Sequence, residues 1–168
     1  LGLTPNLGTD LLGASVWLMY MTVGWHYSKQ VFGCAMVYAN YDSYPISKNQ
    51  RLLLKLSVFS VAFYSFCYLS MHWRNYSPFS TSFSFLNFPV TELGLPLYFD
   101  SLANIFIAIG LVLFLYGVIF KNYQKHKKWP SWNFLVPVLA FYIWWVPLFP
   151  QKEYYLMLVP FFHSLQYL

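Results

Sequence analysis

One histidine, one lysine and one glutamine lie close together inside the first long apolar run of the sequence. His26, Lys29 and Gln30 recur with Thr22 and Gly33 at spacings of three and four residues, so the five share one face of a helix. A lysine that faces lipid at mid-bilayer costs about 2.5–3.5 kcal/mol. We therefore expect this face to point into a helix bundle or a water-filled cavity. The alternative is a structural role, in which Lys29 reaches the membrane surface and His26 hydrogen-bonds a carbonyl of a neighbouring helix.

A second histidine and glutamine occur near the end of the chain, where His163 and Gln166 lie about one helical turn apart. Counted from the starts of their apolar runs, His26 and His163 fall at similar depths in a membrane. Two imidazoles on different helices at one depth can bind a metal ion, or the two faces of a haem. We expect His26 and His163 to bind iron or haem, with Lys29, Gln30 and Gln166 as supporting catalytic groups. The alternative is that each histidine is a core residue whose hydrogen bonds are satisfied within the protein.

A weaker polar group lies around the start of the third apolar run. Asp100 and Asn104 share one helical face, and His72 lies at the end of the second run. A carboxylate in this place could take up a proton or hold a cation, but Asp100 is only about five residues into its run. We therefore interpret Asp100 as a helix cap close to the lipid headgroups.

The composition indicates what kind of protein positions these groups. Of the 168 residues, 58% are hydrophobic and 9% are charged, and the mean hydropathy is +0.47. Soluble domains carry about 25% charged residues, and a chain of this length cannot bury most of itself in a core. Aromatic residues make up 23% of the chain, which is typical where rings lie among acyl chains and headgroups. The sequence therefore predicts an integral membrane protein.

Apolar runs of membrane-spanning character recur along the whole chain. The first begins after the N-cap residues Thr9 and Asp10, and the last is still apolar at Leu168, so we expect the protein to extend beyond this C-terminus. The segment between the second and third runs, about 73–91, is broken by prolines, and we expect it to lie along the membrane interface or to pack over the mouth of the bundle. The prediction is an all-α fold, one polytopic transmembrane helix bundle of about five spans: 11–38, 52–71, 95–120, 132–149 and 154–168 with its continuation.

Connections rich and poor in lysine and arginine alternate along the chain, as an up-and-down bundle requires. The connections 39–51 and 121–131 are basic, whereas those after the second and fourth runs carry Arg74 and Lys152. Basic loops stay in the cytoplasm, so we expect residue 1 outside and both basic loops inside. The expected location is a plasma membrane, in the simplest case the inner membrane of a bacterium.

The net charge of +5 indicates lipid rather than nucleic acid as a partner. The basic residues stand in short clusters between apolar runs, without a Gly-rich phosphate loop or a basic stripe interleaved with exposed aromatic residues. We expect the run 121–128, which includes His126, to bind anionic lipid.

Several motifs of membrane enzymes and channels are missing from the sequence. It has no dense histidine box of the di-iron desaturase type, no nucleophile elbow, no Thr-Val-Gly-Tyr-Gly filter and no Gly-x-x-x-Gly motif. Cys34 and Cys67 fall near opposite ends of different runs, so we expect neither a disulfide nor a metal pair. A retinal Schiff base at Lys29 has little support, because no acidic counter-ion lies at its depth.

These observations favour a membrane-embedded redox or oxygenase-type enzyme, or a subunit of one, that acts on a lipid-soluble substrate. The second hypothesis is a transporter or proton-coupled subunit, in which Thr22, Lys29 and Gln30 line an aqueous path. The third is a structural subunit that packs against other subunits of a larger membrane complex and has no chemistry of its own.

Overall fold

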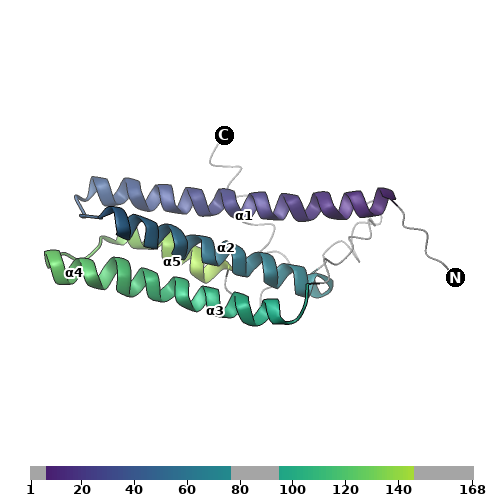
Figure 1. Ribbon diagram of the computed structural model, residues 1–168. Helices are drawn as coiled ribbons and strands as arrows, with labels where there is room; N and C mark the ends of the chain where they lie inside the picture. Colours follow the sequence, from purple (N-terminus) through teal and green to yellow (C-terminus); the bar gives the residue numbers. More distant parts are fainter. Residues whose placement is uncertain (1–6, 77–94, 146–168) are drawn as a thin grey trace.

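A computed structural model describes residues 7–76 and 95–145, and every regular element in these two ranges is a helix. In chain order the elements are α1 (Leu7–Tyr41), α2 (Lys48–Tyr76), α3 (Tyr98–Val112), the π-helix η3 (Leu113–Phe120), α4 (Lys121–His126) and α5 (Trp132–Trp145). Because α3, η3 and α4 follow one another without a break, they form one long helix (Figure 1). The predicted all-α fold is confirmed over the described residues.

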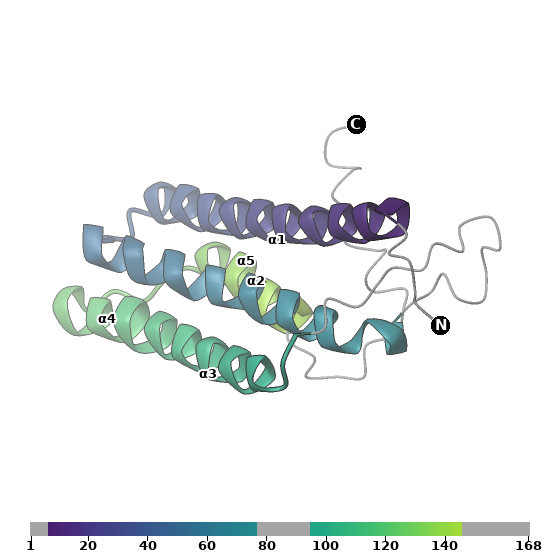
Figure 2. The ribbon, with the colours of Figure 1, turned by 45° about the vertical axis from the view of Figure 1, so that its right-hand side comes forward.

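The helices pack as a bundle around α2. α1, α2 and the long helix run side by side along one axis, and α5 packs among them (Figures 1 and 2). α2 contacts α1, α3, η3 and α5, whereas α1 and the long helix do not contact each other. Successive long helices run in opposite directions, so the α1–α2 loop and the α4–α5 loop lie at the same end of the bundle. This is the up-and-down order that the alternating basic connections predict.

Small residues allow α2 and the long helix to approach closely. The facing residues recur every seven positions: Ala103, Gly110 and Gly117 on the long helix, and Cys67, Ser60 and Leu53 on α2. A Cβ added at Gly110 would overlap Ser60 Oγ, and one added at Gly117 would lie 2.7 Å from Leu53 Cδ1. Small residues at a seven-residue repeat favour close helix contact with a left-handed crossing. The spacing of seven in this repeat differs from the spacing of four in the Gly-x-x-x-Gly motif, which the sequence lacks.

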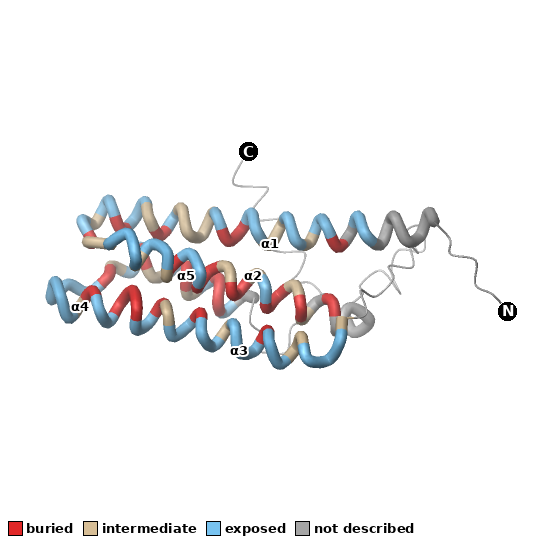
Figure 3. The backbone as a smooth tube through the Cα atoms, viewed as in Figure 1, coloured by how far each residue is buried: buried red, intermediate tan, exposed pale blue. Residues whose placement is uncertain are grey.

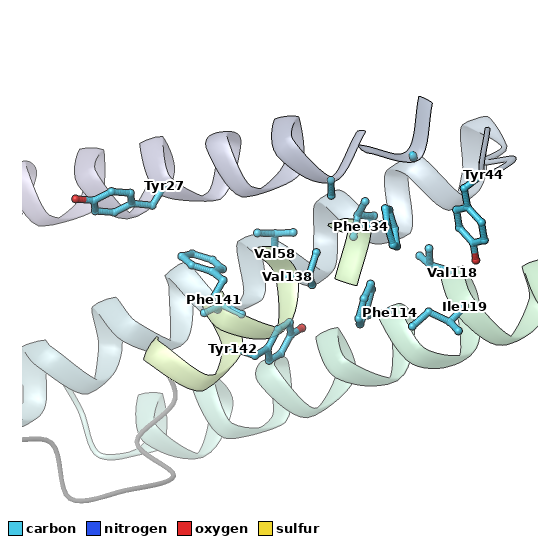
Figure 4. Packing of buried hydrophobic residues seen from close by; sticks show 14 residues of the cluster. Tyr27, Tyr44, Val58, Phe114, Val118, Ile119, Phe134, Val138, Phe141 and Tyr142 are labelled. Atoms are coloured by element: carbon cyan, nitrogen blue, oxygen red, sulfur yellow. The ribbon is translucent and has the colours of Figure 1, made fainter. Parts of the chain in front are cut away.

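The largest core cluster lies where α5 meets α2 and η3 (Figure 4). Phe114 and Val118 from η3, Phe134 and Val138 from α5, and Val58 from α2 are all fully buried there. The rings of Phe114 and Phe134 stack with their centroids 6.4 Å apart. This cluster packs the helices together towards the end of the bundle that carries the α1–α2 loop and the α4–α5 loop, and it fixes the position of both loops.

The start of α2 is fixed by a capping box that also reaches the π-helix. The Gln50 backbone N–H donates to Ser47 Oγ at 3.3 Å, and the Ser47 N–H donates to Gln50 Oε1 at 2.9 Å. Gln50 Nε2 in addition donates to the carbonyl of Val118 at 3.4 Å. In η3 the backbone pairs at the wider spacing, since the N–H of Lys121 bonds to the carbonyl of Tyr116, five residues earlier. One glutamine side chain therefore connects the first turn of α2 to the π-helix.

Two of the described helices are long and apolar enough to cross a membrane, Lys48–Tyr68 and Tyr98–His126. Their 21 and 29 residues correspond to about 31 and 43 Å, against about 30 Å of hydrocarbon. Trp132–Ile143 is apolar but shorter. α1 is the longest of the described helices, with 35 residues, but it is not one of these two. By length and composition, these two helices weakly suggest a membrane protein and do not establish about five spans.

The helix boundaries differ from the expected spans at the two basic connections. α1 and α2 extend into the expected connection 39–51 and leave only 42–47 between them. The long helix continues through the first part of the expected connection 121–131 and ends at His126. Lysine is a good helix former, so the basic residues prolong the helix until Lys127 adopts a left-handed φ of 52°.

The remaining expected spans are described in part. The helix α5 begins at Trp132, the predicted start of the run 132–149, and Pro137 lies inside it. The part of that run after Trp145 lies outside the described residues. The span expected at 154–168 lies outside the described residues.

Candidate functional site

Exposed positions recur along the length of α1 (Figure 3), and the polar residues singled out in the first apolar run are exposed or half-buried. His26 and Lys29 are exposed, and Gln30 is half-buried. Lys29 Nζ lies 3.7 Å from the ring centroid of Trp25, one turn earlier on the same helix, which is a cation–π contact. The amine therefore rests against an exposed aromatic ring of its own helix.

The hydroxyls of Thr22 and Ser28 donate to backbone carbonyls, so their protons are not available to a ligand. Thr22 Oγ1 donates to the carbonyls of Leu18 and Met19, at 3.0 and 2.8 Å. Ser28, on the inner side, is fully buried, and its Oγ donates to the carbonyl of Gly24 at 2.9 Å. Ser28 Oγ also lies 3.5 Å from the carbonyl of Val58, which links α1 to α2.

The described helices do not cover the polar face of α1, contrary to the expectation that this face points into the bundle. At Gly33, on the same face, an added Cβ would meet nothing within 4 Å. The side of α1 that packs against α2 and α5 instead carries buried residues such as Trp17, Ala35 and Ala39. Periodicity predicts correctly that the polar residues share a face, but the described helices pack against the opposite face.

The expected iron or haem site is described only at one of its two ligands. His26 lies on α1, whereas His163 and Gln166 lie outside the described residues, and the structure gives no position for them relative to His26. Within residues 7–76 and 95–145, no group of three or more His, Cys, Asp or Glu side chains lies close enough to hold a metal ion. Of the two imidazoles expected to bind the cofactor, the described residues include that of His26, with Gln30 one turn further along the helix.

The weaker group around Asp100 has a local structural role. Asp100 lies in the first turn of α3, where a carboxylate is favourable to the helix dipole, while the N-cap position is Leu97. Asn104 Nδ2 donates to the backbone carbonyl of Asp100 at 2.8 Å. Asp100 therefore lies close to the expected cap position but does not occupy it. The side chain of His72 lies outside what the structure describes.

A buried group of hydroxyls joins α2 and α5 next to Gly110 of α3, and the sequence reasoning missed it. Tyr142 Oη lies 2.8 Å from Ser57 Oγ and donates to the Ser57 carbonyl at 3.1 Å, while Ser60 Oγ donates to the same carbonyl at 2.7 Å. The missing side chain of Gly110 leaves the space that Ser60 occupies. No spacing in the sequence connects Ser57 with a tyrosine 85 positions later, so only the packed structure reveals this group.

Side-chain hydrogen bonds connect the α1–α2 loop to the α4–α5 loop. Lys128 Nζ donates to the carbonyls of Asp42 and Ser43, at 2.8 and 3.0 Å. Ser131 Oγ donates to the carboxylate of Asp42 and accepts a hydrogen bond from the Phe134 N–H at 3.2 Å, which caps α5. The segments 42–47 and 127–131 therefore form one structural unit at this end of the bundle.

A buried tyrosine and asparagine extend this unit inward. Asn122 Nδ2 donates to the carbonyl of Pro45 at 2.7 Å, and the side chains of Tyr44 and Asn122 are 4% and 1% exposed. Burial raises the pKa of the Tyr44 phenol, and the neighbouring Asn122 side chain lowers it in part. Tyr44 Oη and Asn122 Oδ1 nevertheless have no well-aligned hydrogen-bond partner. The ring of Tyr44 packs 5.3 Å from that of Phe134, which connects the unit to the core.

Comparison of the chain with protein-family models, with curated proteins and with solved structures finds no match.

Proposed function

We propose that this chain is a multi-pass integral membrane protein of about five spans. The end of the bundle that carries the α1–α2 loop and the α4–α5 loop lies in the cytoplasm. Two helices of suitable length and hydropathy support the membrane location. The exposed side of the long helix supports it as well, because Ile105, Phe106, Ile109 and Val112 lie on its surface. In the proposed topology the N-terminus lies outside, and the membrane is a plasma membrane such as the bacterial inner membrane.

The observation that carries the functional proposal is the position of His26 and Lys29 on the side of α1 that the described helices leave uncovered. In a bilayer, a lysine on this side costs about 2.5–3.5 kcal/mol unless it meets a polar partner or water. Ionisable groups at such depths mark functional sites by default. We therefore assign this face, with Gln30, as the wall of an intramembrane site that a further helix completes.

In the most specific form of the proposal, His163 completes this site, and the two imidazoles hold iron or haem. Gln30 and Gln166 would orient the ring nitrogens, and Lys29 would balance charge beside the cofactor. Bound iron or haem would supply electron transfer or oxygen activation to a lipid-soluble substrate. The protein would then be an oxidoreductase or a subunit of one.

The test is metal analysis and an absorption spectrum of the full chain purified in detergent. We expect iron or haem in the wild type, and its loss in His26→Ala and in His163→Ala. His126→Ala is the matched control, because His126 is an exposed histidine at the end of α4. This variant should retain the cofactor. A folded, colourless and metal-free wild-type protein would exclude the cofactor.

A transporter or proton-coupled subunit is the second candidate, favoured by the exposed amine of Lys29 on the same face as Thr22. In that case position 26 should be reached from water. Cys34 is free and exposed, whereas Cys67 is free and buried, so the His26→Cys variant is labelled in a background without Cys34. Reaction with a membrane-impermeant thiol reagent supports an aqueous path, and protection from both sides of the membrane opposes it.

A structural subunit of a larger membrane complex is the remaining alternative. It predicts that an assembly containing both His26→Ala and His163→Ala keeps full activity, and that the polar face of α1 is covered by another subunit.

A further inference from the structure

The end of the bundle that carries both loops has a high density of exposed positive charge. Two exposed basic side chains stand at the start of α2, and three lie in α4 or just after it: Lys48, Arg51, Lys121, Lys125 and Lys127. We call these five residues the basic end. Gln50 lies within hydrogen-bond distance of Val118, and Asn122 bonds to Pro45, so the start of α2 and the start of α4 are at the same height in the bundle.

Acidic charge does little to offset this surface. Asp42 is the one acidic residue in the sequence segments 42–51 and 121–131. Its carboxylate accepts a hydrogen bond from Ser131, and Lys128 holds the adjacent backbone carbonyls. Asp42 and Lys128 are thus occupied in joining the two loops, while the basic end faces outward.

Exposed aromatic rings surround the same end. Tyr41, Trp129 and Trp132 are 82%, 63% and 75% exposed. The ring of Trp129 packs 4.7 Å from that of Tyr123, and Lys127 Nζ lies 5.6 Å from the Tyr123 ring. Exposed tryptophan and tyrosine beside lysine and arginine are typical of the headgroup level of a membrane. An aromatic belt with positive charge matches anionic phospholipid better than it matches zwitterionic lipid.

We propose that the basic end binds anionic phospholipid headgroups as one surface, to which Lys48 and Arg51 contribute as much as Lys121 and Lys125. This inference rests on the proposed membrane location and extends the expected lipid contact beyond the run 121–128. The two segments lie 70 or more positions apart in the sequence, and the hydrogen bonds of Lys128, Ser131 and Asn122 place them side by side. Lys128 acts as a positioning residue, because its ammonium is used between the loops.

The experiment measures lipid binding by the full chain in neutral detergent, titrated with phosphatidylglycerol or phosphatidylcholine and read by native mass spectrometry. We expect preference for phosphatidylglycerol, weakened by salt. The pair Lys48→Gln with Arg51→Gln and the pair Lys121→Gln with Lys125→Gln should each lower that affinity by about 25-fold, from about fivefold per charge. Both pairs remove positive charge from exposed sites, and circular dichroism should show an unchanged helix content.

Charge-preserving variants are the matched control: Lys48→Arg and Lys121→Arg should bind phosphatidylglycerol as the wild type does. An effect of the second pair without the first would overturn the two-loop surface and leave only the run 121–128. Equal affinity for both lipids would overturn the inference while the membrane location stands. Tighter binding to an RNA oligonucleotide than to phosphatidylglycerol would also overturn it. Failure of the chain to enter vesicles of either lipid would instead refute the proposed membrane location.

Discussion

α1 and the long helix lie on opposite sides of α2, and their outer surfaces differ in chemistry. The outer side of the long helix is apolar through its middle, with Ile105, Ile109 and Val112 at least half exposed. The outer side of α1 carries His26 and Lys29 at a comparable distance from the loops. A membrane solvates the first surface and not the second. The difference teaches that the described bundle has one side suited to lipid and another that carries ionisable groups.

The largest expected effect on membrane insertion comes from placing a charge on the apolar side of the long helix. Ile109→Lys puts an ammonium near the middle of the long helix, and we expect membrane insertion to become about 2.5–3.5 kcal/mol less favourable. Insertion can be measured as the glycosylated or membrane-protected fraction of the chain. Gln124→Lys, at an exposed position of α4, is the control and should insert normally. If Ile109→Lys changed nothing, the apolar side would face water rather than lipid.

The same small substitution on a covered and an uncovered face sharpens the comparison. Gly110→Ala places a Cβ against Ser60 Oγ, and we expect a loss of about 1–3 kcal/mol in unfolding free energy from overpacking. Gly33→Ala meets nothing within 4 Å in the described structure, so it should stabilise the helix by about 0.5–1 kcal/mol. Thermal unfolding in detergent measures both. Equal effects would mean that a further element packs on α1 as tightly as α2 packs on α3.

A smaller loss of unfolding free energy is expected at the structural unit formed by the segments 42–47 and 127–131. Ser131→Ala removes the cap of α5 and the hydrogen bond to Asp42, and we expect a loss of about 1 kcal/mol. Ser101→Ala, at an exposed position in α3, should be neutral. Chemical unfolding monitored by circular dichroism distinguishes the two. An unchanged Ser131→Ala variant would show that the cap contributes nothing to the junction of the two loops.

The smallest expected change concerns the hydroxyls buried between α2, α3 and α5. Tyr142→Phe removes the bonds from Tyr142 Oη to Ser57, and we expect a loss of about 0.5–1.5 kcal/mol. Tyr98→Phe, on a tyrosine that is 60% exposed, is the control for loss of a phenol as such. The comparison is made by thermal unfolding. A stabilised Tyr142→Phe variant would indicate that burying these hydroxyls costs more than their hydrogen bonds return.

Several features of the fold were predictable from the sequence because they depend on local patterns. The apolar runs predict the helices, the start of α5 at Trp132 was correct, and the alternating basic connections predict the up-and-down order. The capping box of Ser47 and Gln50 was also readable from its spacing, although the sequence reasoning missed it. In each case residues close in sequence determine the structure.

The direction in which the polar face of α1 points was not predictable in the same way. In a membrane both the lipid and the bundle interior are apolar, so periodicity shows which residues share a face but not which face is covered. The bonds of Tyr142 to Ser57 and of Lys128 to Asp42 join residues more than 80 positions apart, and no local pattern signals them. For His163 and Gln166 the sequence remains the sole basis, since they lie outside the described residues.

The π-helix η3 gives the long helix a point at which its length could change by one residue without breaking. Deleting one residue between Leu113 and Phe120 would return the backbone to ordinary α pairing, and the helix on either side would keep close to its present facing, because a π turn absorbs one extra residue. The apolar surface of α3 and the direction of Lys121 and Lys125 would both be retained. The π-helix is therefore a place where the long helix can lose a residue while its apolar side and its charged end keep their relative orientation.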